Sequence, residues 1–243
     1  MAEESPPERL VYAILGWLLA RSAGTALNLR ELTFEDGSIG RWLRPDIKRF
    51  ERAVELQARA IRRIDAARPD AFGSRLMVEM TVRTIAAYRA LIDAGVDRSC
   101  ARKLVADVGW DIYSKMLNLY SWPFRLTTHD PSKRISRTIK ALLWFPFNPR
   151  GASGYAVQHW EADSNTYTHF THCPPQSFVR ALIASGDERG DLEAFRESWC
   201  RYDWPGADIL AGDGLRGHYE RRQTLSHGDS VCDMCWRARV EER

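Results

Sequence analysis

Apolar residues recur every three or four positions through most of the first 145 residues, which is the spacing of helices with one apolar face. The clearest stripe begins after Pro45, and Pro69 follows its last turn. Gly95 closes a second stripe in the manner of a helix C-cap, whereas Pro123 and the segment 127–131 interrupt the pattern. The ranges for which the pattern predicts helices are 45–68, 73–94, 99–120 and 132–144.

Beyond Gly154 the pattern changes to an alternation of apolar and polar residues, which is typical of strands. The segment 163–165 has the composition of a hairpin turn, Pro174-Pro175 opens a further helix, and Pro205-Gly206 is expected in a loop. The expected elements are strands 155–162 and 166–171, helices 174–185 and 191–202, and strands 218–225 and 231–240. The sequence therefore predicts an α+β fold, with a helical N-terminal half packed on an antiparallel sheet that carries two further helices.

The composition is ordinary for a globular protein, with 44% hydrophobic and 28% charged residues in a chain of 243. A formal net charge of +3 does not indicate a nucleic-acid partner. The acidic start Met1-Ala-Glu-Glu4 is unlike a secretory signal, and the five cysteines have no regular spacing, which favours reduced thiols. We therefore expect a cytoplasmic protein, and a homo-oligomer is left open.

One apolar run, Leu10 to Ala20, is the membrane candidate of the sequence. It is shorter than the roughly twenty residues that span a bilayer, and Pro7 at its start is typical of the first turn of a soluble helix. The expected structure is a buried helix and no membrane span, with membrane association as the alternative.

The expected helices 45–68 and 132–144 carry many basic residues. Solvated faces explain such charges most simply. The alternative is an interaction protein that uses these helices to bind an acidic partner, in which case binding would weaken strongly with salt.

Thiols and carboxylates gather in the last third of the chain. They occur as Cys173-Pro174, as Cys200-x-x-Asp203, and as a closing segment from Thr224 to Cys232-Asp233. Cys200 and Asp203 are three residues apart on an expected helix and so share a face. Cys173 ends an expected strand whose same face holds His169. Such a strand end, a helix face and an inward strand residue can converge on one site.

The closing strand sorts its two cysteines. Side chains alternate along a strand, so Cys232 belongs to the apolar face, whereas Asp233 and Cys235 belong to the other face. A CxxC metal or redox pair is therefore disfavoured. If Cys173, Cys200 and Cys232 converge, they become three soft metal ligands or one nucleophile with supporting groups; otherwise they are small buried hydrophobes.

The same residues resemble the L-2-amino-thiazoline-4-carboxylic acid hydrolase family. The matching motifs are Cys173-Pro174, Cys200-Arg-Tyr-Asp203 and the segment 224–233, Thr-Leu-Ser-His-Gly-Asp-Ser-Val-Cys-Asp, and the stretch 87–115 is similar in character. The resemblance implies a domain over 76–243 preceded by a helical extension over 1–75, the two forming one compact unit. The sequence departs from the family pattern in the closing strand, which continues Cys232-Asp-Met-Cys-Trp236 where family members tend to have Cys-Asp-Phe.

More distantly, the closing strand resembles vinyl-reductase-type small-molecule-binding domains, in which cysteines hold a structural zinc beside an apolar pocket. This chain has Thr224 where those domains tend to carry a further ligand. The resemblance implies, as an alternative function, a zinc-stabilised sensor or carrier domain without turnover, with Cys200 and Cys232 as metal ligands. Zinc is the one cofactor that either resemblance brings into consideration.

The leading hypothesis is a hydrolase-like enzyme that acts on a small cyclic amidine, a thiazoline or a related C–N or C–S bond. Cys173 is the expected nucleophile, because a helix N-terminus beside it would lower its thiol pKa. Asp203 and Asp233 are expected to transfer protons or to bind the amidinium. The supporting or substrate-binding residues are His169, His172 and Thr224. The expected partner is a small-molecule substrate.

Overall fold

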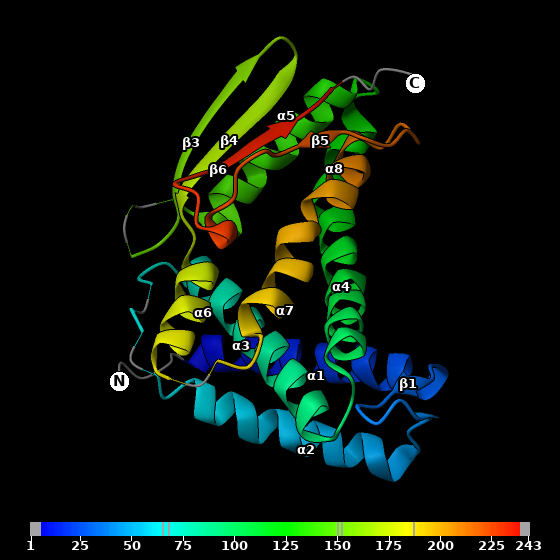
Figure 1. Ribbon diagram of the computed structural model, residues 1–243. Coiled ribbons are helices and arrows are strands. Elements are labelled where there is room, and N and C mark those ends of the chain that lie inside the picture. Colours follow the sequence, from blue (N-terminus) through cyan, green and yellow to red (C-terminus); the bar gives the residue numbers. More distant parts are fainter. Residues whose placement is uncertain are drawn as a thin grey trace. The chain divides into compact units, whose positions relative to one another are not determined.

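Helices dominate the first half of the chain in the computed structural model, which describes residues 6–238 except 65, 68, 150, 152 and 187 (Figure 1). The α-helices are α1 (Pro6–Leu29), α2 (Arg44–Ile61), α3 (Phe72–Asp93), α4 (Arg98–Thr127), α5 (Pro131–Leu142), α6 (Pro174–Ala184), α7 (Asp191–Glu197) and α8 (Asp203–Ala211). The strands are β1 (Leu32–Thr33), β2 (Ile39–Gly40), β3 (Ala156–Ala162), β4 (Asn165–His172), β5 (Tyr219–Glu220) and β6 (Cys232–Trp236). The predicted α+β class with a helical N-terminal half is confirmed.

The described residues form two compact units, and each unit draws on three stretches of the chain. Unit 1 comprises residues up to 66, 78–112 and 178–199, whereas unit 2 comprises 67–77, 113–177 and 200 onward. The units of the structure are thus interleaved along the chain. The division into 1–75 and 76–243, which followed from a resemblance, stays a prediction.

Unit 1 is helical apart from the small β1–β2 hairpin. The predicted stripe of α2 is confirmed, since Ile47, Phe50 and Ile61 are buried. A buried ion pair of this unit joins α3 to α7, where the Arg89 guanidinium donates to both oxygens of the Asp191 carboxylate. Their side chains are 5% and 0% exposed, so the pair is held away from water.

Helix α1 differs from its prediction as a buried helix. Its apolar residues Leu10, Ile14, Trp17 and Leu18 are 40% or more exposed, because the helix packs on the rest of unit 1 along one side only. By length and composition, α1 is the one described helix that could cross a membrane, a property shared by core helices and by N-terminal signal sequences. The expected absence of a membrane span stays a prediction.

Unit 2 contains an antiparallel sheet with the strand order β3-β4-β6-β5 (Figure 1). The predicted hairpin is confirmed, with Asp163 and Ser164 in the left-handed backbone conformation of a two-residue turn. Helix α5 packs against β4, and the Asp130 side chain caps its first turn by accepting the Ser132 backbone N–H. The indole N–H of Trp236 donates to the Thr168 hydroxyl and so joins β6 to β4.

Two helices run through positions where the sequence predicted breaks. Helix α4 continues past Pro123 to Thr127; Ser121 is fully buried and Arg125 donates to the Ile209 carbonyl, so tertiary packing outweighs the hydrogen bond lost at proline. Helix α8 contains the Pro205-Gly206 pair expected in a loop. Pro205 occupies the first turn, where its missing N–H costs nothing, and Gly206 lets α4 approach closely, since a Cβ there would lie 2.9 Å from Leu117.

The last strands are also shorter than predicted. Strand β5 covers only Tyr219–Glu220. The end of the predicted strand instead forms a 3₁₀ turn, η3 (Leu225–His227), which Gly228 ends in a left-handed conformation. Strand β6 ends at Trp236, and residues 239 and 240 of the predicted strand lie outside the described residues.

Candidate active site

Cys173, Cys200, Cys232 and Asp203 come together in unit 2 from three elements and one junction. Cys173 lies between β4 and α6, Cys200 in the 3₁₀ turn η2 (Trp199–Arg201), Asp203 at the first position of α8, and Cys232 at the first position of β6. The expected helix over 191–202 is interrupted at Ser198, whose ψ of −94° is not helical. After this break, Cys200 lies in η2 and Asp203 begins α8, so the two residues belong to two successive short helical elements rather than to the expected helix.

The three thiols influence one another electrostatically and are held by nearby polar groups. Burial raises the pKa of Cys173 well above its usual value, and Cys200, Cys232 and Asp203 raise it further. Burial likewise raises the pKa of Cys200 to about 12, against a hydrogen bond with Ser226 and the Arg221 charge. All three thiols are consequently protonated near pH 7.

This result contradicts the expectation that a helix N-terminus lowers the pKa of Cys173. The Gln176 backbone N–H at the start of α6 does act in the expected direction, but burial has the larger effect. Cys173 as nucleophile stays a prediction, and it now requires a neighbouring base to remove the thiol proton.

Asp203 is the carboxylate of this cluster. Its Oδ2 accepts hydrogen bonds from Arg221 Nη1 at 3.2 Å and from the Tyr219 hydroxyl at 3.2 Å, and the two ion-paired side chains are 14% and 6% exposed. Burial raises the pKa of Asp203 to about 6, because it outweighs the lowering by Arg221 and Tyr219. A carboxylate with this pKa exchanges its proton near neutral pH, as a general acid or base must.

Arg221 is a site residue that the sequence analysis missed. Its Nη2 donates to the Cys200 carbonyl at 2.7 Å, and its guanidinium lies 4.7 Å from the centre of the Trp204 ring. One arginine thus positions both Cys200 and Asp203. The sequence did contain a signal for Arg221. In the predicted strand 218–225, residues 219 and 221 are two positions apart, so Arg221 shares a face with Tyr219.

Buried tyrosines complete the surroundings of the cluster. The Tyr113 ring stacks on Tyr202 with centroids 5.4 Å apart, and burial followed by the Asp203 charge raises the pKa of the Tyr113 hydroxyl. Burial also raises the pKa of Tyr155, with a further contribution from Cys173. Nothing in the sequence distinguishes Tyr113 and Tyr155 from other core aromatics.

Thr224 joins the cluster through Cys232. Its hydroxyl lies 3.4 Å from the Cys232 sulfur and 3.2 Å from the Ser226 hydroxyl. The Leu225 backbone N–H donates to the same sulfur at 3.3 Å, and Asp229 accepts the Thr224 N–H at 2.7 Å. The conformation of the 224–229 segment is therefore set by its contacts with the thiol and with Asp229.

Asp233 and His169 do not join the cluster. They are register partners on β6 and β4 and lie on the sheet face opposite Cys232 and Phe170, because side chains alternate along a strand. Asp233 accepts the backbone N–H groups of Arg222 and Gln223, and the His169 ring contacts Trp160 edge-on. The predicted site is therefore corrected: Asp233 holds the chain after β5, and His169 packs on the outer face.

His172 directly precedes Cys173, but both of its ring nitrogens are engaged. Nδ1 lies 2.5 Å from the Gly154 carbonyl and Nε2 lies 3.0 Å from the Ser177 hydroxyl. The carbonyl can only accept, so Nδ1 donates to it, and Nε2 pairs with the Ser177 hydroxyl. His172 thus fixes the β4–α6 junction that carries Cys173.

The arrangement does not resemble a zinc site. Within the described part of the chain, no group of three or more His, Cys, Asp or Glu side chains is arranged to hold a metal ion. The predicted separation of Cys232 and Cys235 onto opposite faces of β6 is confirmed by the register of that strand. Zinc ligation by Cys200 and Cys232 therefore finds no further ligands among these residues.

Comparison of the chain with protein-family models, with curated proteins and with solved structures finds no match. The resemblances to the hydrolase family and to vinyl-reductase-type domains are therefore untested and stay predictions.

Proposed function

We propose that this protein is a hydrolase-like enzyme that opens a C–N bond of a small cyclic amidine, with Asp203 as its proton-transfer group. The observation that carries the proposal is the convergence of three thiols on a buried carboxylate whose pKa is about 6. Burial with an arginine partner is a common way to adjust a carboxylate for acid–base catalysis.

The chemistry follows from the protonation states. The thiol of Cys173 is neutral near pH 7, since burial raises its pKa, so attack on the amidine carbon requires a base. Ionised Asp203 takes the thiol proton as the S–C bond forms, and returns it to the ring nitrogen as the C–N bond breaks. Water then cleaves the S–C bond and restores the thiol. If Cys173 does not attack, Asp203 activates water for the same step.

The experiment is a substrate screen with 2-aminothiazoline-4-carboxylate and related cyclic amidines, in which NMR detects opening of the ring. We expect Cys173→Ser and Asp203→Asn to lower kcat/KM by about a hundredfold or more. The matched controls are Cys235→Ser, on the opposite face of β6, and Asp163→Asn, in the exposed hairpin turn. Both controls should keep wild-type kcat/KM.

The pH profile separates a catalytic role of Asp203 from a structural one. In the wild type, kcat/KM should fall as pH drops through about 6, where Asp203 takes up a proton and ceases to act as a base. In Asp203→Asn that limb should disappear. An unchanged acid limb in the variant would remove Asp203 from the proposed chemistry.

The second candidate function is a small-molecule-binding domain without turnover, and the raised pKa values of the three thiols favour it, because protonated thiols react slowly. Iodoacetamide mapping near pH 7 together with elemental analysis tests it. Slow labelling of Cys173, Cys200 and Cys232 with no turnover of any cyclic amidine would favour binding. One zinc per chain would require ligands beyond those described above.

A further inference from the structure

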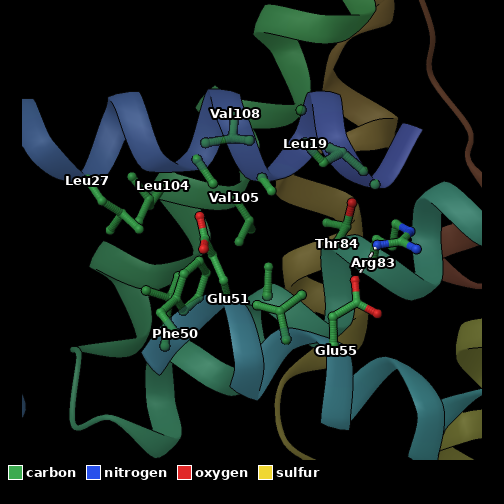
Figure 2. Close-up of a pocket in the computed structure, with 17 residues that line it drawn as sticks. Leu19, Leu27, Phe50, Glu51, Glu55, Arg83, Thr84, Leu104, Val105 and Val108 are labelled. Atoms are coloured by element: carbon green, nitrogen blue, oxygen red, sulfur yellow. Dashed lines mark hydrogen bonds and ion pairs between the residues drawn. The ribbon is translucent and has the colours of Figure 1, made fainter. Parts of the chain in front are cut away.

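Unit 1 contains an apolar cavity that the proposed function does not use. It has a volume of about 160 Å³ and lies among α1, α2, α3 and α4 (Figure 2). Its walls are mainly aliphatic, including Leu19, Leu27 and Val108, with the aromatic ring of Phe50. A dry engineered cavity of about 150 Å³ holds a molecule the size of benzene, so this cavity has room for one small ring.

The charged groups of the cavity are not balanced. Arg83 donates to Glu79 at 2.8 Å and to Glu55 at 2.9 Å, and Glu79 also accepts from Arg62. Glu51 is a third carboxylate, and among the described residues no side chain forms a hydrogen bond or an ion pair with it. Of the three charged residues in the cavity wall, Arg83 and Glu55 pair with each other, so Glu51 is the lining carboxylate without an ion-pair partner among the described residues.

The unpaired carboxylate points into the cavity. Figure 2 shows Glu51 rising from α2 beside Phe50 toward α1, whereas the Glu55–Arg83 pair lies at the other end. Glu51 also borders the neighbouring groove over α1 and α2, together with Arg21 and Arg44. Both arginines are exposed, and neither forms an ion pair with Glu51 among the described residues. An apolar chamber with one unneutralised carboxylate is complementary to an apolar body that carries one positive charge.

We propose that unit 1 binds a small organic cation in this cavity, a primary amine with one apolar ring, whose ammonium group pairs with Glu51. The ring would displace no ordered polar contact, because the wall around it is aliphatic. An anionic ligand is disfavoured, because the Arg83 charge is already shared by two carboxylates. This inference does not depend on the proposed function, since it uses residues of unit 1 alone.

The test is calorimetric titration of the full chain with 2-phenylethylamine, with 2-phenylethanol as its neutral counterpart and with 3-phenylpropionate as an anion. We expect the amine to bind about ten- to a hundredfold more tightly than the alcohol, the range for a hydrogen bond to a charged group, and the anion to bind most weakly. Glu51→Gln should abolish the preference for the amine and leave binding of the alcohol unchanged. Glu35→Gln, which removes an exposed carboxylate outside the cavity, should behave as wild type.

A second variant locates the ligand. Ala87→Leu adds a side chain to the cavity wall and should abolish binding of all three probes; if it fails to fold, Ala23→Leu fills the same cavity from α1. Equal affinity for amine and alcohol, an amine preference that survives in Glu51→Gln, or the absence of any binding by the wild type at millimolar probe would each overturn the proposal.

Discussion

Two opposite effects act on the ionisation of Asp203, and Asp203→Asn measures which one is larger. Burial favours the neutral acid, whereas the Arg221 charge and the Tyr219 hydroxyl favour the carboxylate. The balance places the pKa at about 6, above the ordinary value of 3.8. Folded Asp203 therefore keeps its proton to a higher pH than unfolded Asp203 does.

The consequence for stability follows by linkage. Between about pH 4 and pH 6 the folded chain binds more protons at Asp203 than the unfolded chain, so this residue makes the free energy of unfolding fall as pH rises through that window. The shift of the pKa from 3.8 to about 6 means that the folded chain binds this proton somewhat more than a hundredfold more tightly than the unfolded chain. This ratio corresponds to about 3 kcal/mol. The loss is complete above the folded pKa.

Urea unfolding of the wild type and Asp203→Asn at pH values from 4 to 7 isolates this contribution. Removing the partner of buried Arg221 costs stability in the variant, but that cost is the same at each pH, because arginine stays charged. The other carboxylates titrate in both proteins. The free energy of unfolding of the wild type minus that of the variant should therefore fall by about 2.5 kcal/mol across the range, less than the full value of about 3 kcal/mol because unfolded Asp203 is already more than half ionised at pH 4. Tryptophan fluorescence follows unit 2 through Trp204 and Trp236, which both contact Tyr219.

A difference that stays constant with pH would refute the reasoning, because it would mean that Asp203 has its ordinary pKa in the folded protein. A difference that rises with pH would mean that the attraction of Arg221 outweighs burial. Asp163→Asn, in the exposed turn, serves as the control and should give a constant difference.

Two further substitutions test the packing. Asp191→Ala should lower the free energy of unfolding by about 3–5 kcal/mol in urea denaturation, because it leaves the Arg89 guanidinium, 5% exposed, without its buried carboxylate. Gly73→Ala should lower the melting temperature markedly, since a Cβ there would lie 2.1 Å from the Pro146 carbonyl oxygen, and overpacking costs roughly 1–3 kcal/mol or more. Gly37→Ala, where no atom lies within 4 Å but φ is +80°, should cost only about 1 kcal/mol; equal losses at Gly73 and Gly37 would show that the close approach is relaxed.

The elements that the sequence predicted well are those with strong local patterns. The stripe of α2 and the alternation of β3 and β4 depend on residues close in the chain, and both were found. The errors lie where distant packing decides. Gly206 and Pro123 are local signals for breaks, but contacts with residues about 90 positions away keep both segments helical.

The candidate site divides in the same way. The convergence of Cys173, Cys200 and Cys232 with Asp203 could be anticipated, because the three motifs flank predicted elements. Arg221, which pairs with Asp203, was missed. The pKa of Cys173 was predicted in the wrong direction, because the degree of burial at a helix N-terminus is a property of the assembled unit.

The interleaving of the two units has a consequence for synthesis on the ribosome. Unit 1 needs residues as late as 199, and unit 2 needs strand β6, which ends at Trp236. Neither unit can complete its core until most of the chain has been made, so the apolar faces of α1 to α4 must wait for their last partners. Proteins that fold late in this way expose aggregation-prone surface during synthesis, and this chain should depend on chaperones for its yield.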